Sequence, residues 1–520
     1  MAWHAEQENL DVQDEIEPID TSELPSELNE SKQKEKTFLK PIEVGTEKEL
    51  LDMTRMLSEE QMIVLSNFVD NFRRIIISKK CPEIILKAIR VIATGGAGVG
   101  KTFVIKIVSK WAEKILRKPG DHPLKPKVLI LGPTGMAASL IDGTTFETGL
   151  SFKFGTKKYL PLRDAQLESF RNLLEELELI IMDEFSMIKS DRLYDVQRRM
   201  EEIFISKDLF AGRSVMMVGD IMQLPPVKGR PVFSRPFSVK NRSMFNSTDN
   251  IWKSFDVVTL KVSQRQKANE WRDCLNRIRV GEASEKDKAL LETRRLAKHP
   301  NLDINKACHV FYTNEEVNHH NEKMLNNLNS DLVKVSASGI YPRGYKLQFD
   351  PNGFVESTPF MKELCLKKGS RIMLTFNVNL VDSLVNGSLG TVLDFVYDNN
   401  SKLKAVIIRF DDPEAGKMQR LEHQHDCHPY ANENGTPIYR KTLDHTLKLG
   451  GGKGKTIQFP IRLSWASTCH KLQGVTIKEG SDLVVHGPKK KAMPKNMYYV
   501  MMSRCSGLYN PHLDEEVDLD

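Results

Sequence analysis

One short segment constrains this chain more than any other, the sequence GGAGVGKT at Gly95–Thr102. The apolar run before it, residues 88–93, predicts a buried strand, and residues 103–108 after it predict a helix. This context separates a working phosphate loop from a glycine-rich turn that carries a surface lysine. Glycines let backbone N–H groups turn inward and cradle phosphates at a helix N-terminus. The segment predicts a nucleoside triphosphate site made by Gly95, Gly96, Ala97, Gly98, Val99 and Gly100, with Lys101 reaching the β/γ-phosphates and Thr102 holding Mg²⁺.

Length and composition set the frame for that site. A chain of 520 residues is too long for one ordinary domain, and 40% hydrophobic with 28% charged residues is enough to build several cores. The net charge is only +6, so a polyanion would meet local basic patches. Seven cysteines without a CxxC pair fit a reducing compartment, and no apolar run approaches the roughly 20 residues of a membrane helix. The acidic start indicates neither a secretory signal nor a transit peptide, so we expect an intracellular protein without membrane contact.

Strand-like runs alternate with helical patterns along much of the chain, which predicts parallel α/β sheets. The strand-like runs are 127–131, 179–182, 215–218 and 257–260, then 309–312 and 371–374. Between 379 and 459 short alternating runs with turn residues predict a small β-barrel inserted into the second α/β unit. We therefore expect an acidic flexible arm at 1–45, a first domain at 46–248, a second domain at 249–378 and 460–510 around the barrel at 379–459, and an acidic tail at 511–520.

Two acidic residues follow the strand-like run at 179–182. Asp183 is placed to hold Mg²⁺ through water, and Glu184 to orient or deprotonate the attacking water. An Asp-Glu pair after a strand is by itself a weak signal, because such pairs often begin a solvated loop. About 80 residues after a phosphate loop, it predicts the second half of a phosphoryl-transfer site.

Three further side chains are candidates for the γ-phosphate. Gln223 follows another apolar run in GDIMQLPP and could position the water, although an exposed glutamine in a Pro-Pro loop is an equal alternative. Arg265 and Arg504 each follow an apolar, strand-like run and could act as arginine fingers. A single arginine is usually a surface cation, so these two depend on the wider pattern.

The order of these motifs resembles the superfamily 1 DNA helicases of the 5′-to-3′ branch, specifically the Pif-type family and its RecD-like relatives. The resemblance covers about residues 50–510. It is carried by LSEEQ around Gln61, GGAGVGKT, MDEFSM, GDIMQLPPV, LGPTGMAA, RIMLTFNVN, LVNGSLGTV, TCHKLQG at Thr468–Gly474 and YVMMSRC.

This resemblance implies two RecA-like domains with ATP between them, so that Arg265 and Arg504 reach the γ-phosphate across the cleft. It implies that Gln61 reads adenine, that Gly474 lies in a segment coupling DNA to ATP, and that the insert is similar to a Src-homology-3 barrel. The residues that it places at single-stranded DNA are Thr134, Thr468, His470 and Lys471. In the family a His-Ser commonly follows the glycine–threonine turn, whereas this chain has Glu147 there, and no DNA contact is assigned to that acid.

The segment at 149–162 alternates and turns at Gly155, which predicts a β-hairpin. It mixes aromatic residues with lysines, a composition suited to base stacking and phosphate contact. Phe152 and Phe154 are therefore candidates for a strand-separating wedge. The equal alternative is that both phenylalanines pack inward.

Weaker signals leave other questions open. His423, His425, Cys427 and His428 invite a zinc interpretation, but their spacing fits no usual finger and a polar loop is favoured. The lysines at 489–491 favour the nucleus over the cytoplasm, while a lysine-rich surface turn explains them as well. The acidic arm is a candidate site for protein partners, and we expect a monomer in the absence of DNA.

Three functions fit the pattern. The leading hypothesis is an ATP- and Mg²⁺-dependent DNA helicase that moves 5′ to 3′ on single strands and opens tailed or forked duplex. The second is a translocase that strips proteins or resolves RNA–DNA hybrids and barely unwinds duplex. The third is a binding protein that uses nucleotide as a switch, which the complete set of catalytic positions argues against.

Overall fold

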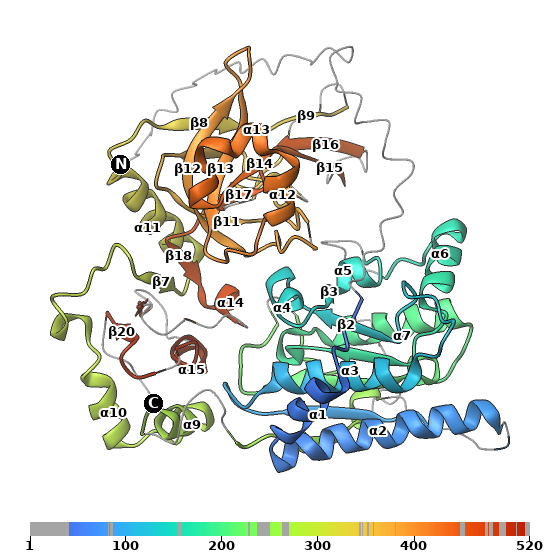
Figure 1. Cartoon of the computed structure of the whole chain (residues 1–520). Helices are drawn as coiled ribbons and strands as arrows, with labels where there is room; N and C mark the ends of the chain where they lie inside the picture. The colour runs from blue at the N-terminus through green and yellow to red at the C-terminus, as the bar shows by residue number, and fades with distance from the viewer. Residues whose placement is uncertain are drawn as a thin grey trace, which may run out of the picture.

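A computed structural model of the chain describes residues 41–81, 83, 87–152, 159–226, 229–236, 250–262, 270–342, 345, 347–350, 353–356, 358–379, 381–447, 453–473, 477, 482–487, 496–505 and 507–514. Figure 1 shows two α/β bodies side by side, with a β-rich body above them. No helix in the described part of the chain is long and apolar enough to cross a membrane.

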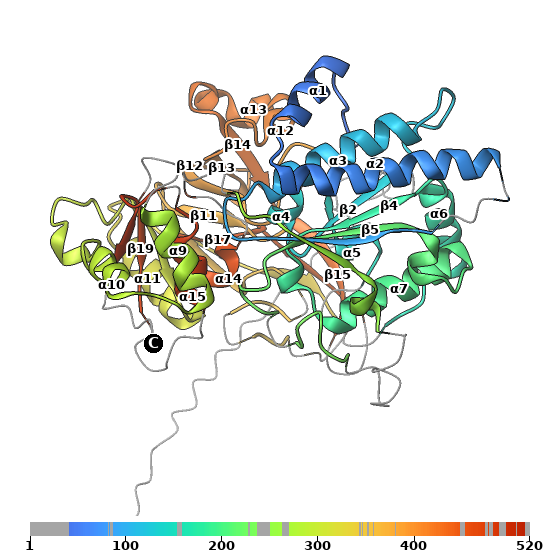
Figure 2. The same ribbon diagram turned by 90° about the horizontal axis from the view of Figure 1, so that it is seen from below.

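The first domain is built on a six-stranded parallel sheet with the order β3-β2-β4-β5-β1-β6. Alternate residues of its strands enter two separate apolar cores, one on each face. Helices α1, α2 and α3 cover one face and α7 covers the other (Figure 2). The strands are β1 (Arg90–Thr94), β2 (Val128–Gly132), β3 (Thr144–Thr145), β4 (Leu179–Met182), β5 (Ser214–Gly219) and β6 (Asp256–Thr259). The helices are α1 (Glu47–Arg55), α2 (Glu59–Lys80), α3 (Lys101–Leu116), α4 (Gly135–Leu140), α5 (Phe146–Gly149), α6 (Asp164–Leu174) and α7 (Ser190–Phe204).

The second domain has a four-stranded parallel sheet with the order β18-β7-β19-β20. Its core joins this sheet to the helices that face the first domain. The strands are β7 (Cys308–Phe311), β18 (Ala466–Thr468), β19 (Leu483–Val485) and β20 (Pro511–Leu513). The helices are α9 (Glu270–Val280), α10 (Glu285–Glu292), α11 (Asn314–Asn326), α14 (Cys469–Leu472) and α15 (Met497–Met502).

The third body is antiparallel and has its own core. Its main sheet has the order β14-β13-β12-β11-β17, and two smaller sheets, β10-β8 and β15-β16-β9, lie beside it. The strands are β8 (Val333–Ser336), β9 (Ser338–Ile340), β10 (Glu363–Leu366), β11 (Arg371–Leu374), β12 (Leu389–Tyr397), β13 (Leu403–Phe410), β14 (Gly435–Tyr439), β15 (Lys441–Thr446), β16 (Lys453–Gln458) and β17 (Ile461–Leu463). Two short helices, α12 (Lys417–Glu422) and α13 (Gln424–Cys427), close one side.

Four expected domain boundaries differ from the structure. Strand β6 pairs in parallel with β1, so the first domain extends past the boundary expected at residue 248. Strands β11 and β17 belong to the antiparallel sheet, which therefore exceeds the expected limits of 379 and 459 on both sides. Strand β20 completes the second sheet, so the expected tail at 511–520 begins with a structural strand. A short apolar run does not reveal which sheet it joins, because pairing is decided by partners far away in the sequence.

Candidate nucleotide and nucleic-acid sites

The phosphate loop joins β1 to α3 at the carboxyl edge of the first sheet. Gly98 and Gly100 have φ angles of 81° and 76°, a left-handed conformation that glycine adopts without steric cost. The loop is anchored at its first residue, because Gly95 N donates to Gly219 O (3.1 Å) at the end of β5. The loop therefore presents its backbone at the N-terminus of α3, with Thr102 exposed as the second residue of that helix.

Lys101 lies over this loop and is surrounded by charged groups. Its ammonium donates to Gly95 O (2.9 Å) and Gly96 O (2.7 Å). Burial lowers its pKa, and the positive charge of Arg504 adds to that effect. The carboxylates of Glu184, Asp220 and Asp183 oppose the shift, so both domains contribute charges to one centre.

The two predicted acids lie at the end of β4, beside the loop, and both are buried. Burial, followed by the nearby charge of Glu184, raises the pKa of Asp183 to about 7, while Lys101 opposes the shift. Glu184 has a φ angle of 47°, a left-handed conformation that costs a non-glycine residue free energy and is typical of functional sites. Its carboxylate accepts a hydrogen bond from Gln473 Nε2 (3.3 Å), which also donates to Ser186 Oγ (3.0 Å). Carboxylate and hydroxyl oxygens of this kind suit Mg²⁺.

Both polar atoms of the Gln61 side chain form hydrogen bonds within the first domain. Its Oε1 accepts from Ser58 N (2.9 Å) in a capping box at the start of α2, and its Nε2 donates to Val99 O (2.9 Å). The residue therefore ties α2 to the phosphate loop. Its expected contact with adenine stays a prediction.

The remaining nucleotide-site candidates have different outcomes. Gln223 is buried behind Asp220, and its side-chain Oε1 has no hydrogen-bond partner among the described residues. Arg504 is buried, donating from Nε to Val500 O (2.9 Å) and from Nη2 to Ser503 Oγ (3.0 Å). The run before Arg504 is helix α15, not the expected strand, because six consecutive apolar residues fit a buried helix as well as a strand. Arg265 and Gly474 lie outside the described residues.

Three residues that no sequence pattern singled out join the two domains at this site. Asp220, after β5, is fully buried and is held by Arg279 of α9, with an Nη2–Oδ1 distance of 2.7 Å. Tyr499 of α15 donates to Asp220 Oδ2 (3.2 Å) and accepts from Ala97 N (2.8 Å) in the phosphate loop. The sequence contains a recognisable Arg-x-Gly turn at 279–281 and a tyrosine in YVMMSR. No local sequence pattern pairs either of them with Asp220.

The predicted DNA residues lie at the starts of α4 and α14 or on α14, and the two helices are neighbours in Figure 1. Thr134 Oγ1 accepts from Ala137 N (3.2 Å) at the start of α4. Thr468 is buried at the start of α14, His470 is half-buried and Lys471 is exposed. The described contacts place them at the junction of the three bodies, since a Cβ added to Gly135 would lie 2.6 Å from Asn377 Oδ1, next to the antiparallel sheet.

Arg462 of β17 adds a cation that the sequence did not single out. It is 7% exposed, and its Nε and Nη2 have no hydrogen-bond partner among the described residues. Burial lowers its pKa to about 10. The surrounding protein, followed by the positive charge of Arg462, lowers the pKa of Lys471, which places the two cations near each other. A buried cation without a counter-charge is costly, and an approaching anion relieves that cost.

Phe152 follows the inward-packing alternative. It is 7% exposed in the core beneath α7, with the guanidinium carbons of Arg192 and Arg199 at 4.4 Å and 5.2 Å from its ring centre. This position offers no face for base stacking. Phe154 and the turn of the expected hairpin lie outside the described residues.

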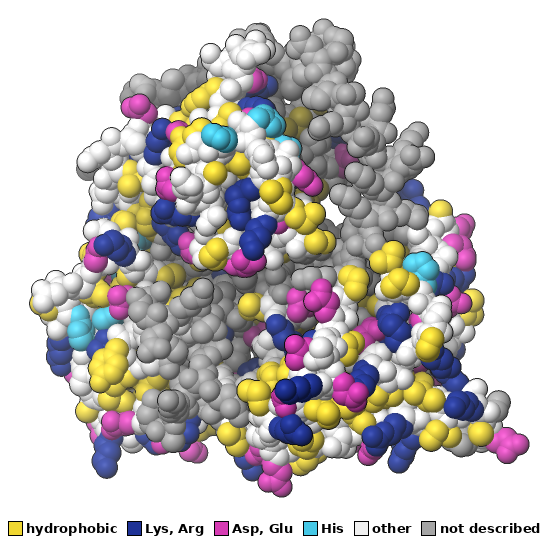
Figure 3. Space-filling model, in the orientation of Figure 1, with side chains coloured by type: hydrophobic (Ala, Val, Ile, Leu, Met, Phe, Trp, Pro, Cys, Tyr) yellow, Lys and Arg dark blue, Asp and Glu magenta, His cyan; other side chains and the backbone are white. Residues whose placement is uncertain are grey.

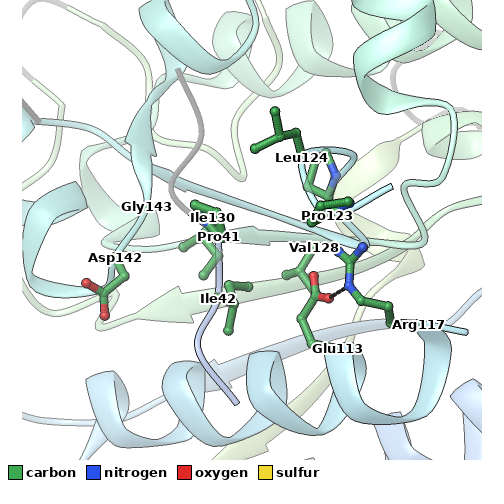
Figure 4. A pocket seen from close by; sticks show the side chains of 11 residues that line it. Pro41, Ile42, Glu113, Arg117, Pro123, Leu124, Val128, Ile130, Asp142 and Gly143 are labelled. Carbon is green, nitrogen blue, oxygen red and sulfur yellow. Dashed lines mark hydrogen bonds and ion pairs between the residues drawn. The ribbon is translucent and has the colours of Figure 1, made fainter. Parts of the chain in front are cut away.

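Two other features lie away from the phosphate loop. A cavity of ≈ 190 Å³ at the far end of α3 is lined by residues that include Ile42, Arg117 and Leu124, and Arg117 Nε bonds Glu113 (2.7 Å) there (Figure 4). The described residues contain no group of three or more His, Cys, Asp or Glu side chains arranged for a metal, and Cys427 donates to backbone carbonyls such as His423 O (3.4 Å). On the face shown in Figure 3, basic and acidic side chains are interspersed over α1–α3, so those helices offer no single-sign patch.

The fold and this site define a P-loop protein with two RecA-like domains, whose phosphate loop is contacted from the second domain. Residues 56–289 match the family model described as PIF1-like helicase. Curated relatives named Pif1 or RRM3 align over about three quarters of the chain. Over these residues the chain is similar to the Pif1-type helicases.

Individual comparisons give the extent of this similarity. The chain is 26% identical over 453 residues to the ATP-dependent DNA helicase RRM3 of Saccharomyces cerevisiae, covering 76% of this chain and 59% of the yeast protein. It is 26% identical over 417 residues to the ATP-dependent DNA helicase Pif1 of Campylobacter jejuni, covering 76% and 83%. The crystal structure of Bacteroides Pif1 bound to ssDNA matches with a TM-score of 0.61 at 23% identity, covering 89% and 93%, which supports the fold.

Proposed function

We propose that this chain is an ATP-dependent DNA helicase that translocates 5′ to 3′ on single-stranded DNA and opens tailed or forked duplex. The observation that carries the proposal is the convergence of Lys101, Asp183, Glu184 and Arg504 from two domains on one phosphate loop. Lys101 neutralises phosphate charge, Glu184 accepts a proton from the attacking water, and Arg504 contributes positive charge from the second domain. The Pif1 proteins to which this chain is similar support the DNA substrate.

Thr102 and Asp183 would hold Mg²⁺, because their oxygens flank the loop at the carboxyl edge of the sheet. The bound ion would neutralise charge that develops on the transferred phosphate. An Asp183 whose pKa is near 7 has to be ionised to serve, and a nearby divalent cation favours the ionised form.

On the nucleic-acid side, Thr134, His470, Lys471 and Arg462 line the junction of the three bodies. Contacts of this kind go to the phosphate backbone and carry little sequence information, so the proposal names single-stranded DNA without a preferred sequence. The antiparallel body, which we propose to be a Src-homology-3-like barrel, contributes Arg462. A monomeric state, a nuclear location and a protein-binding role for residues 1–45 stay predictions from the sequence.

The test is ATP hydrolysis and strand separation on matched duplexes with a 5′ tail or a 3′ tail. We expect opening of the 5′-tailed duplex alone, hydrolysis driven by single strands, and loss of both in Lys101→Ala. Lys106→Ala is the matched control, because Lys106 lies on the same helix and its ammonium is 3.8 Å from Asp142, a long ion pair. Opening of the 3′-tailed duplex would overturn the polarity, and unchanged hydrolysis in Lys101→Ala would overturn the site.

A second candidate is translocation without duplex opening, and the inward packing of Phe152 favours it. The same assay separates the two functions. Strand-stimulated hydrolysis that opens neither duplex, together with displacement of a protein bound to the single strand, would identify a translocase.

A further inference from the structure

Tyr499 joins the middle of the phosphate loop to the end of β5 through one hydroxyl group. The side chain is buried, and its oxygen accepts from Ala97 N at 2.8 Å while the O–H donates to Asp220 Oδ2 at 3.2 Å. Tyr499 belongs to α15, whereas Ala97 and Asp220 belong to the first domain. One phenol therefore bridges two loops of the opposite domain.

The carboxylate that receives this proton is also held by an arginine of the second domain. Asp220 is fully buried, and Arg279 donates to it from Nε (3.0 Å to Oδ2) and from Nη2 (2.7 Å to Oδ1). Because Arg279 lies on α9, two helices of the second domain hold a single carboxylate of the first. The close fit also depends on Gly96, where an added Cβ would lie 3.3 Å from the Tyr499 hydroxyl and 3.7 Å from Arg279 Cδ.

The Tyr499 hydroxyl has one proton, so it can donate a hydrogen bond either to Asp220 or to a phosphate in the loop, but not to both. Burial, followed by the charge of Asp220, raises the pKa of Tyr499, so the phenol stays neutral. With its proton directed to Asp220, the oxygen presents only lone pairs to Ala97 N–H. A phosphate oxygen in the loop is also an acceptor and requires the same N–H. The hydroxyl can donate to that phosphate only by leaving Asp220.

We propose that Tyr499 is a positioning residue that transmits nucleotide binding to the second domain: phosphate in the loop displaces its hydroxyl from Ala97 and Asp220. This inference rests on nucleotide binding at the phosphate loop, as in the proposed function. Arg504 lies two residues beyond the end of α15, and its Nε donates to Val500 O of that helix. Displacement of Tyr499 therefore moves the helix to which Arg504 is hydrogen-bonded, and so couples binding to the placement of that arginine.

Tyr499→Phe tests the proposal, because it removes the hydroxyl and keeps the buried ring. Without the competing hydroxyl, a non-hydrolysable ATP analogue should bind about 3- to 10-fold more tightly, the equivalent of one hydrogen bond. The kcat for hydrolysis on single-stranded DNA should fall, since Arg504 is no longer repositioned. A KM and a kcat that both decrease form a signature that simple loss of packing does not produce.

Tyr509→Phe is the matched control, because Tyr509 lies in the same domain with an exposed side chain. A thermal melt of each variant confirms that the second domain is folded. Analogue affinity equal to that of the unmodified protein, or unchanged kcat, would overturn the role of Tyr499. The analogue arm needs no hydrolysis, so it remains informative if the chain binds nucleotide without turning it over, the result that would overturn the proposed function instead.

Discussion

Gln473 of the second domain donates a hydrogen bond from Nε2 to Oε2 of Glu184 in the first domain, at 3.3 Å. Glu184 is the candidate acceptor of the water proton, and Gln473 lies two residues beyond Lys471, a candidate DNA contact. One side chain therefore links the segment that carries Lys471 to the candidate proton acceptor. This is a direct physical route for strand-stimulated hydrolysis.

Gln473→Leu should uncouple ATP hydrolysis from the binding of single-stranded DNA. The substitution removes the hydrogen bonds that Gln473 donates to Glu184 and Ser186. A typical hydrogen bond contributes a net free energy of about 1 kcal/mol, which corresponds to roughly a 5-fold effect for each bond. We expect the stimulation of ATP hydrolysis by single-stranded DNA to fall about 5- to 25-fold, while hydrolysis without DNA changes little. Steady-state hydrolysis with increasing DNA measures this, with exposed Gln424→Leu as the control. Full stimulation in Gln473→Leu would rule out the route.

Glu184→Gln should slow ATP hydrolysis without weakening the binding of ATP. The amide keeps the size of the side chain but cannot accept the proton of water, and removing a general base typically costs 10²–10⁴-fold. We expect kcat to fall by about that factor while the affinity for ATP is retained. Nucleotide binding and single-turnover hydrolysis measure the two quantities. Glu178→Gln, at the start of β4 and paired with Lys79, should behave like the unmodified protein; an equal loss there would point to general destabilisation.

Arg462→Met should weaken the grip on single-stranded DNA. The guanidinium is buried near Lys471, and its Nε and Nη2 have no hydrogen-bond partner among the described residues; a phosphate would supply acceptors for them. We expect affinity to fall about 10-fold or more, since hydrogen bonds to charged groups are worth ~1.5–3 kcal/mol. The slope of log K against log salt should shrink by about 0.7, the loss of one phosphate contact on a single strand. Exposed Arg409→Met on β13 is the control, and an unchanged slope in Arg462→Met would remove Arg462 from the interface.

The sequence predicted the nucleotide side of the first domain well, because its signals are local. The run before the phosphate loop is β1, and the run before Asp183 and Glu184 is β4, since an apolar strand and the loop after it are neighbours in the chain. The structure brings Lys101 and both acids close together, while their roles in hydrolysis stay predictions.

What the sequence could not show is pairing at a distance. Asp220 is separated by 59 positions from Arg279 and by 279 positions from Tyr499. No sequence motif contains two of these three residues. Strand β6 was recognised as a strand but assigned to the wrong domain, since its edge position follows only from pairing with β1. Helix α15 was taken for a strand because its residues are apolar on every side.

The second domain should lose stability in mild acid through His320. Burial, followed by the charges of His309, His486 and Lys323, lowers the pKa of His320 to about 4, and its Nε2 has no hydrogen-bond partner among the described residues. An unfolded histidine has a pKa of about 6.5. Between these values the unfolded chain binds a proton that the folded domain does not, so the free energy of unfolding decreases as the pH falls from about 6.5 to about 4.

His320→Gln should flatten that dependence, because glutamine does not titrate. Thermal midpoints measured from pH 7.5 to 4.5 test it, and the variant should lose fewer degrees over this range than the unmodified protein. His319→Gln on the same helix is the matched control, since His319 is exposed and should leave the slope unchanged. His309, whose pKa burial also lowers, leaves a residual slope in every variant. Parallel curves for His320→Gln and the unmodified protein would show that His320 does not carry the acid sensitivity.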